Sequence, residues 1–296
     1  MNMKKISEIR FNLSTIILVV LAGFLFNSCS KLQNNVLAPV TYQVGFHPSG
    51  WATVNSENFH GTYIKDSLDY NLSSCATCHA ADFKGGTTGV SCYTCHKGPQ
   101  GPESCNTCHG SAANPAPPVD LEGDTSTSSP GVGAHQAHLL GSNLASAVSC
   151  GSCHLVPQVA ARGVHPTGTR KATIDFSGVA LTMTNTQGSR YYDSTAATIT
   201  PNPKFDPQTL KCSNTYCHGD FVGGNNFSPS WTGGASQATC GTCHGIPPNT
   251  PIHQGQTLQT CYFCHSPMIG PDGTIQDSTL HVTGKLVLYG KQVSAW

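Results

Sequence analysis

The sequence predicts a chain of mostly irregular coil, with short helices, a few short strands and little regular secondary structure. Two observations lead to this fold class. The 296 residues include 15 cysteines and 14 histidines but only 10% charged residues, which is unlike an ordinary globular enzyme. Nearly all the cysteines also recur in one short motif. Something other than a conventional apolar core must therefore organise this chain.

Six copies of the pattern Cys-x-x-Cys-His occur, and a seventh copy contains two additional residues between its cysteines. The cysteine pairs are Cys75 and Cys78, Cys92 and Cys95, Cys105 and Cys108, Cys150 and Cys153, Cys212 and Cys217, Cys240 and Cys243, and Cys261 and Cys264. The histidines that follow them are His79, His96, His109, His154, His218, His244 and His265.

This spacing has a chemical reason. Two thiols can add to the two vinyl groups of haem, and the next residue then places an imidazole under the iron as the proximal ligand. The two additional residues of the seventh copy can loop out without moving Cys217 or His218, so we expect seven covalently attached haem c groups. At this density of cofactor, the coil and short elements are expected to wrap around a stacked multihaem core, and folding is expected to depend on haem.

Two other uses of paired cysteines compete with haem attachment. A disulfide scaffold and zinc knuckles both use such pairs, but neither requires a histidine after every second cysteine. The seven pairs use all the cysteines except Cys29. The haem interpretation therefore accounts for every motif, and Cys29 needs a separate explanation.

Seven histidines lie outside the motifs, which equals the number of expected haems. They are the candidate distal ligands of the iron: His47, His60, His135, His138, His165, His253 and His281. The alternative is that some of them are surface residues and the match in number is partly accidental. Apart from the N-terminal segment, only Met183 and Met268 could compete, so methionine ligation is expected at one site at most. Ligation by two histidines favours the ferric state and a low potential.

The N-terminus has the pattern of an export signal. Lys4, Lys5 and Arg10 precede an apolar stretch over 11–26, and Cys29 follows it. Residues 1–28 are therefore expected to be a lipoprotein-type signal peptide, with Cys29 as the lipidated first residue of the mature chain. An ordinary cleaved signal and an uncleaved anchor remain alternatives, although the apolar run is short for a membrane span. The protein is expected to be exported and lipid-anchored in the cell envelope, at the outer membrane.

The rest of the chain is expected to form two haem-rich modules. A tether at 29–40 leads to an N-terminal trihaem module at 41–110, a Pro/Ser/Ala-rich linker at 111–134 and a C-terminal tetrahaem module at 135–296. A haem-free insertion at 171–210 contains 172–176 and 179–183, which partly alternate as a small hairpin would. Residues 285–289 also have the pattern of a strand. The tryptophans Trp51, Trp231 and Trp296 are expected to pack on porphyrin faces.

The charge of the chain excludes one class of partner. Cleavage before Cys29 would leave 12 basic and 14 acidic residues, a formal net charge of −2. Each haem would add two propionates, which would make the holoprotein clearly acidic. Nucleic acid is therefore not an expected partner.

The C-terminal half resembles a family of multihaem cytochromes. The resemblance depends on His135-Gln136-Ala137-His138, on the stretched motif with Gly219, on the Cys240 motif with Gly245-Ile246-Pro247-Pro248, and on Leu280-His281-Val282. That family, with CxxxxCH followed by CxxCH, occurs in metal-reducing bacteria such as Geobacter, and its members are exported and associated with extracellular electron transfer. By this analogy His60, His138 and His281 are distal ligands.

The resemblance implies an electron carrier and not an enzyme. Electrons would pass from periplasmic or membrane cytochromes to extracellular acceptors through closely spaced haems with two histidine ligands each. Two alternatives remain open: a multihaem reductase with one open haem, which needs an iron without a distal ligand, and a subunit of a cytochrome filament. A lipid anchor argues against the filament, because it tethers each chain to a membrane.

Overall fold

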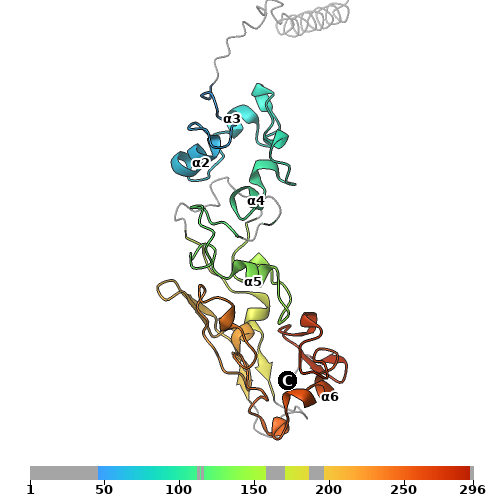
Figure 1. Ribbon diagram of the computed structural model, residues 1–296. Coiled ribbons are helices and arrows are strands. Elements are labelled where there is room, and N and C mark those ends of the chain that lie inside the picture. Colours follow the sequence, from blue (N-terminus) through green and yellow to red (C-terminus); the bar gives the residue numbers. More distant parts are fainter. Residues whose placement is uncertain (1–45, 112–113, 115–116, 158–170, 187–196, 294–296) are drawn as a thin grey trace, which may run out of the picture. The chain divides into compact units, whose positions relative to one another are not determined.

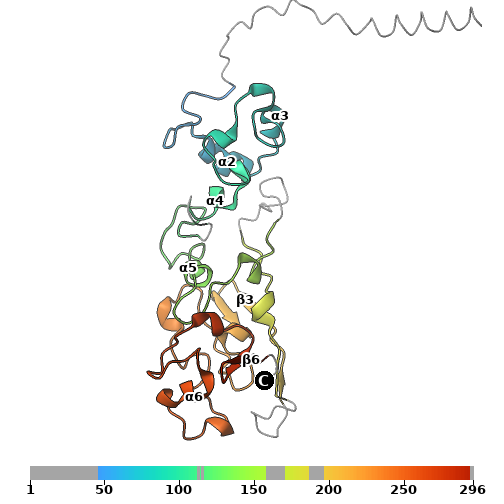
Figure 2. The same ribbon diagram turned by 90° about the vertical axis from the view of Figure 1, so that its right-hand side faces the viewer.

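The computed structural model describes residues 46–111, 114, 117–157, 171–186 and 197–293. Within these residues most of the chain is coil and turn, and Figures 1 and 2 show only short helices and strands. The predicted fold class, with low regular secondary structure, is confirmed. No helix among the described residues is long and apolar enough to cross a membrane.

The helices are short. The α-helices are α2 (His60–Leu68), α3 (Ala76–His79), α4 (Cys105–Cys108), α5 (His135–Leu139) and α6 (Tyr262–His265). The 3-10 helices are η1 (Gly86–Thr88), η2 (Cys92–Thr94), η3 (Gly101–Glu103), η4 (Cys150–Ser152), η5 (Gly178–Leu181), η6 (Tyr216–His218), η7 (Ala235–Gln237), η8 (Pro251–His253), η9 (Leu258–Thr260) and η10 (Ser278–Leu280). Many of them coincide with the cysteine motifs, so the motifs themselves nucleate much of the regular structure.

The described strands form three antiparallel pairs. They are β1 (Thr184–Asn185) with β2 (Thr198–Ile199), β3 (Lys204–Asp206) with β4 (Lys211–Ser213), and β5 (Leu286–Leu288) with β6 (Lys291–Val293). Strand β5 lies within 285–289, where the sequence predicts a strand, and that prediction is confirmed. In the second pair Phe205 lies opposite Cys212, so a motif cysteine is part of a strand.

The predicted hairpin between 172–176 and 179–183 is wrong. The second of these segments is mostly the 3-10 helix η5, and the first pairs with the motif of Cys150 instead. Ile174 forms a bridge with His154, and the Asp175 amide donates to the Cys153 carbonyl at 2.9 Å. A long-range backbone pairing therefore replaces the local one that the alternation indicates.

The apolar core of the described residues is small. Leu72 and Phe83 are buried, with Phe83 only 2% exposed, and Ile64 of α2 packs against them. Cys75 and Cys92, the first cysteines of two motifs, pack against the same cluster. This cluster therefore positions two motifs rather than filling the centre of a globule.

The chain divides into two compact units, Met1–His60 and Gly61–Trp296. The modules expected at 41–110 and 135–296 stay a prediction. Within the second unit, the described part of the predicted linker makes defined contacts. Glu122 forms an ion pair with Lys65 at 2.8 Å, and the Pro130 carbonyl accepts a hydrogen bond from Trp231 Nε1 at 2.8 Å. This segment thus contacts residues on both sides of it in the sequence.

Candidate haem-ligation sites

Five of the motifs close a single helical turn. The amide of the motif histidine donates to the carbonyl of the first cysteine, at 2.9 to 3.0 Å, in the motifs that end at His79, His96, His109, His154 and His265. This is the bond from residue i+4 to residue i of an α-helix. Residues i, i+3 and i+4 share one face of a helix, so the two thiols and the imidazole of each motif face the same side.

The stretched motif has a different backbone conformation before its second cysteine. Cys212 lies in β4, and its amide donates to the Pro229 carbonyl at 3.1 Å. Asn214 then adopts a left-handed conformation, with φ of 52°, before η6 begins. The stretched spacer therefore contains the end of a strand, and Cys217 and His218 lie in a tight turn, as the second cysteine and the histidine of the five motifs above do.

This stretched motif packs against the motif of Cys240. Gly219, with φ of 101°, lies so close to the Cys243 carbonyl that a Cβ atom at this position would collide with it. Asn225 strengthens the contact, because its side chain donates to the carbonyls of Gly241 and Thr242 at 3.1 and 3.2 Å. The backbones of the two motifs are thus in direct contact.

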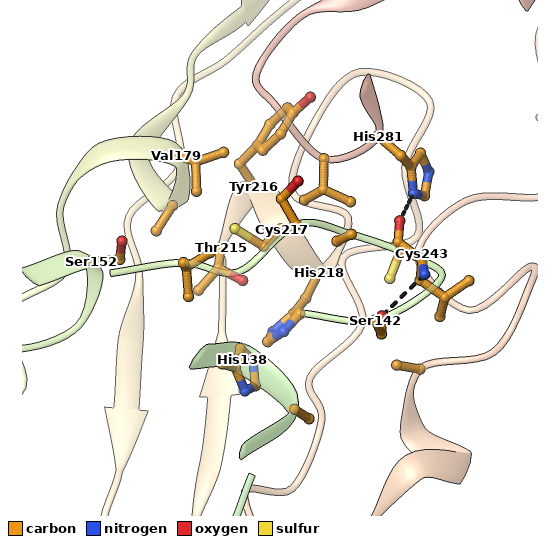
Figure 3. Close-up of a pocket in the computed structure, with 18 of the residues that line it drawn as sticks. His138, Ser142, Ser152, Val179, Thr215, Tyr216, Cys217, His218, Cys243 and His281 are labelled. Atoms are coloured by element: carbon orange, nitrogen blue, oxygen red, sulfur yellow. Dashed lines mark hydrogen bonds between the residues drawn. The ribbon is translucent and has the colours of Figure 1, made fainter. Parts of the chain in front are cut away.

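Four motif histidines each face one histidine from outside the motifs. The ring centroids of His135 and His154 are 6.2 Å apart, and those of His138 and His218 are also 6.2 Å apart. His244 and His281 are separated by 6.3 Å, and His253 and His265 by 6.3 Å. Figure 3 shows the facing rings of His138 and His218. Each of these pairs joins one motif histidine and one candidate distal histidine.

These separations fit two imidazoles on opposite sides of one metal ion. Rings in direct face-to-face contact are closer, as in His47 and Trp51 with centroids 4.4 Å apart. Two metal–nitrogen bonds of about 2 Å, together with the distance from each nitrogen to its ring centre, bring the centroids to about 6 Å. The planes may take any angle about such an axis, and they range here from 15° to 81°. The four pairs therefore suit haem iron, which takes two axial protein ligands.

Hydrogen bonds determine which ring nitrogen of each histidine remains available to bind a metal. The Nδ1 atoms of His135, His138, His154, His265 and His281 bond to the backbone carbonyls of Val132, Ala134, Thr173, Val287 and Leu144, at 2.6 to 3.1 Å. A carbonyl only accepts, so Nδ1 carries the proton and donates it. Each of these rings therefore presents Nε2 as the atom that can bind a metal.

Burial favours the neutral, ligating form of five paired histidines, because it lowers their pKa. It lowers the pKa of His218 to about 4, with a smaller contribution from the nearby His138. Burial also lowers the pKa of His135, His253, His265 and His281 below the usual histidine range. A metal binds only the unprotonated nitrogen, so this environment favours ligation at neutral pH.

The two cysteines of the stretched motif are half-buried. Burial raises the pKa of Cys217 to about 12 and that of Cys212 to about 11. All fourteen motif cysteines are free thiols, and none forms a disulfide in the described chain. Cys29, the predicted lipidation site, lies outside the described residues.

One cavity of about 2050 Å³ connects these sites. Ordinary small-molecule pockets measure about 300 to 1,000 Å³, so this cavity has room for several porphyrins. Its walls include the cysteines and histidines of the four C-terminal motifs and the four histidines that face them. Cys105, Cys108 and His109 line it too, so the third motif borders the same space.

The structure shows fewer contacts for the remaining candidate iron ligands. In the first unit, His60 Nδ1 donates to the Trp51 carbonyl at 2.8 Å, and His47 stacks on the Trp51 ring. In the second unit, His79 Nδ1 contacts the Val90 carbonyl at 3.0 Å. His165 lies outside the described residues. Met268 lines the cavity near His265, but His253 already faces that ring.

Trp231 contacts both candidate ligands on α5. Its ring meets His135 edge-on with centroids 4.7 Å apart, and it lies at 29° to His138 at 5.8 Å. Gly133 packs directly against the indole, where a Cβ atom would collide. This tryptophan is expected to pack on a porphyrin face, and among the described residues its ring contacts both histidines. Trp51 also contacts two histidines, stacking on His47 and lying at 41° to His60.

Replacing Trp231 by alanine should loosen two sites together. The loss of one hydrogen bond and two aromatic contacts should destabilise the fold by about 2–3 kcal/mol. The electron paramagnetic resonance (EPR) signals of two low-spin haems should broaden or shift, and denaturant unfolding should report the stability. Trp51→Ala is the matched control, since it should alter signals of other haems. A spectrum of Trp231→Ala identical to that of the unmodified protein would contradict this role.

Sequence reasoning missed the groups that orient the rings. The carbonyls of Val132, Thr173, Val287 and Leu144 belong to residues with no recognisable motif. Only the spacing of His135 and His138, three residues apart, contains a signal, because it is a helical spacing. The pairing of individual histidines depends on contacts between segments far apart in the sequence, as between His281 and Leu144.

Comparisons with known proteins support a cytochrome. Searches of curated proteins and of solved structures found no match to this chain. Residues 211–244 match the model of the Geobacter CxxxxCH...CXXCH motif, and this range contains the two motifs whose backbones touch at Gly219. With its further Cys-x-x-Cys-His copies, the chain carries the signature of covalently bound haem, and its segment 211–244 is similar to the motif of that Geobacter family.

Proposed function

We propose that the chain is a heptahaem c-type cytochrome that relays electrons and performs no bond-making chemistry. The observation that supports this most directly is the set of four histidine pairs, each with one motif histidine and one histidine from outside the motifs. An iron with two histidine ligands has no open position for a substrate, and it changes only its oxidation state. Haem supplies the Fe(III)/Fe(II) couple, and the chain holds, orients and shields it.

Close spacing of the sites supports a relay. His135 and His138 are three residues apart on α5 and belong to different pairs, so two sites share one helical turn. The loop after α5 supplies the Leu144 carbonyl to His281, which belongs to a third pair. The third motif borders the same cavity. Electrons could therefore pass between neighbouring sites without a mobile carrier.

The proposal extends to the place of the protein in the cell. An exported chain with a lipid on Cys29 would be held at the outer membrane, between periplasmic or membrane donors and extracellular acceptors. Its partners would be other cytochromes. The motifs and the match at 211–244 support a cytochrome, and the export signal in the sequence supports the location.

The first experiment is a low-temperature EPR spectrum of the purified ferric protein, with mass spectrometry of the same sample. We expect only low-spin signals and a mass with seven haems and a lipid at Cys29. The near-perpendicular pairs, at 68° and 81°, should give signals with a wider spread of g-values than the near-parallel pairs, at 22° and 15°.

Other outcomes would reject parts of the proposal. A high-spin ferric signal that responds to cyanide or nitrite would indicate an open haem and favour a reductase. A mass with six haems would remove Cys212, Cys217 and His218 from the binding residues. Uniform filaments in electron micrographs of the same sample would favour a structural subunit.

A further inference from the structure

The eight paired histidines differ in what their Nδ1 atoms contact. Seven of them have a hydrogen-bond partner: five bond to the carbonyls described above, His244 to the Gly245 carbonyl at 2.9 Å, and His253 to the Thr250 hydroxyl at 2.5 Å. His218 is the exception among these eight. Its Nδ1 is buried and has no hydrogen-bond partner in the described chain. The hydroxyl of Thr215, three residues earlier, is buried and unpartnered as well.

The exception follows from the way the stretched motif is built. In the turn that ends at His218, the Tyr216 carbonyl accepts the amide of Gly219, and the Thr215 carbonyl accepts the amides of His218 and Asp220. These two carbonyls of the turn are therefore already engaged by backbone amides. His154 and His265 instead find acceptors in other segments, at the carbonyls of Thr173 and Val287.

An acceptor at Nδ1 changes how strongly an imidazole donates electrons through Nε2. The partner draws the Nδ1 proton away, which raises the basicity of the ring and stabilises the more positive metal. An imidazole without such a partner stabilises ferric iron less, so the reduction potential of its haem rises. At this site only His138 has the usual partner, the Ala134 carbonyl at 2.9 Å.

Burial acts in the same direction at this site. Thr215 is 3% exposed and Tyr216 is 5% exposed, and both precede Cys217 directly in the motif. A low dielectric disfavours the oxidation state that carries the additional positive charge, which is the ferric state. The missing hydrogen bond and the burial therefore both favour reduction.

We propose that the haem attached at Cys212 and Cys217, between His218 and His138, has the highest reduction potential of the four sites described by histidine pairs. This inference rests on the proposed ligation and adds an order of reduction potentials among the four sites. Electrons shared among these four sites reside first at the stretched motif, and the other three sites act as donors to it. The unusual spacing of this motif thus has an electronic consequence and is more than a tolerated insertion.

The test uses four single variants of the full-length holoprotein. His135→Ala, His138→Ala, His253→Ala and His281→Ala each remove the expected distal ligand of a different site. A redox titration followed by EPR should show one low-spin component lost in each variant. The component lost in His138→Ala should have the highest midpoint potential of the four. A component lost in any of the other three variants that titrates above it would overturn the inference.

A fifth variant keeps the inference testable if an alanine variant misfolds. His138→Met keeps a sixth ligand, and a histidine–methionine pair raises the potential. The same component should then move further upward while the other components stay in place, and a shift of a low-lying component would count against the inference. Failure of the proposed function has a different signature: high-spin haem in the unmodified protein rejects the ligation, and this ranking with it.

Discussion

Removing both histidines of α5 should convert two haems from low spin to high spin. His135→Ala and His138→Ala should each convert one haem, because each ring faces a different motif histidine, His154 or His218. The double variant should convert two. The numbers of high-spin haems in the single variants should add up in the double variant, because the two irons do not share a ligand. EPR spin counting on the ferric protein gives the measurement.

Exogenous ligands provide a second measurement of the same change. An iron that has lost its distal histidine can bind carbon monoxide when it is reduced. The single variants should bind one equivalent and the double variant two, whereas the unmodified protein should bind little. Gln136 lies on the same helix and has no imidazole to offer an iron, so Gln136→Ala is the matched control. Equal binding by the control and the double variant would show that α5 does not hold two ligands.

The chemistry of attachment could be predicted from the sequence because it is local. A cysteine pair and the next histidine lie within one turn, as in α3 and α6, so spacing alone indicates which side chains face together. The coil-rich fold follows for the same reason, since frequent short motifs leave little room for long helices. The stretched motif was predicted as a haem site from the same logic, and its residues fall within the family match at 211–244.

The pairing of the candidate distal histidines could not be predicted. His281 faces His244, and its orientation depends on the Leu144 carbonyl, which is 137 residues away in the sequence. No local pattern encodes such a contact. The same limit explains the wrong hairpin at 172–183, because a backbone pairing with the motif of Cys150 outweighs the alternation of apolar residues. Conversely, the strand at β5 pairs with its neighbour β6, and local reasoning succeeded there.

Gly219→Ala should disturb two haem sites through one added methyl group. The new Cβ would collide with the Cys243 carbonyl, and φ of 101° is itself unfavourable for alanine. The strain of about 1–3 kcal/mol from the backbone alone adds to the cost of the collision. Because the motifs of Cys212 and Cys240 would separate, His218 and His244 should both lose alignment with their partners. Two haems should therefore become high-spin while mass spectrometry still counts seven.

The control for this change separates the effect of the contact between the two motifs from the effect of backbone strain. Gly234 has φ of 77°, and a Cβ atom there would meet nothing within 4 Å. Gly234→Ala should therefore carry the backbone cost without separating any motifs, and its EPR spectrum should stay low-spin. If both variants give the same spectrum, the close contact between the motifs does not align the ligands. If only Gly219→Ala changes, the pairing of CxxxxCH with CxxCH has a structural reason: the two turns hold each other in register, and each keeps the histidine of the other in place.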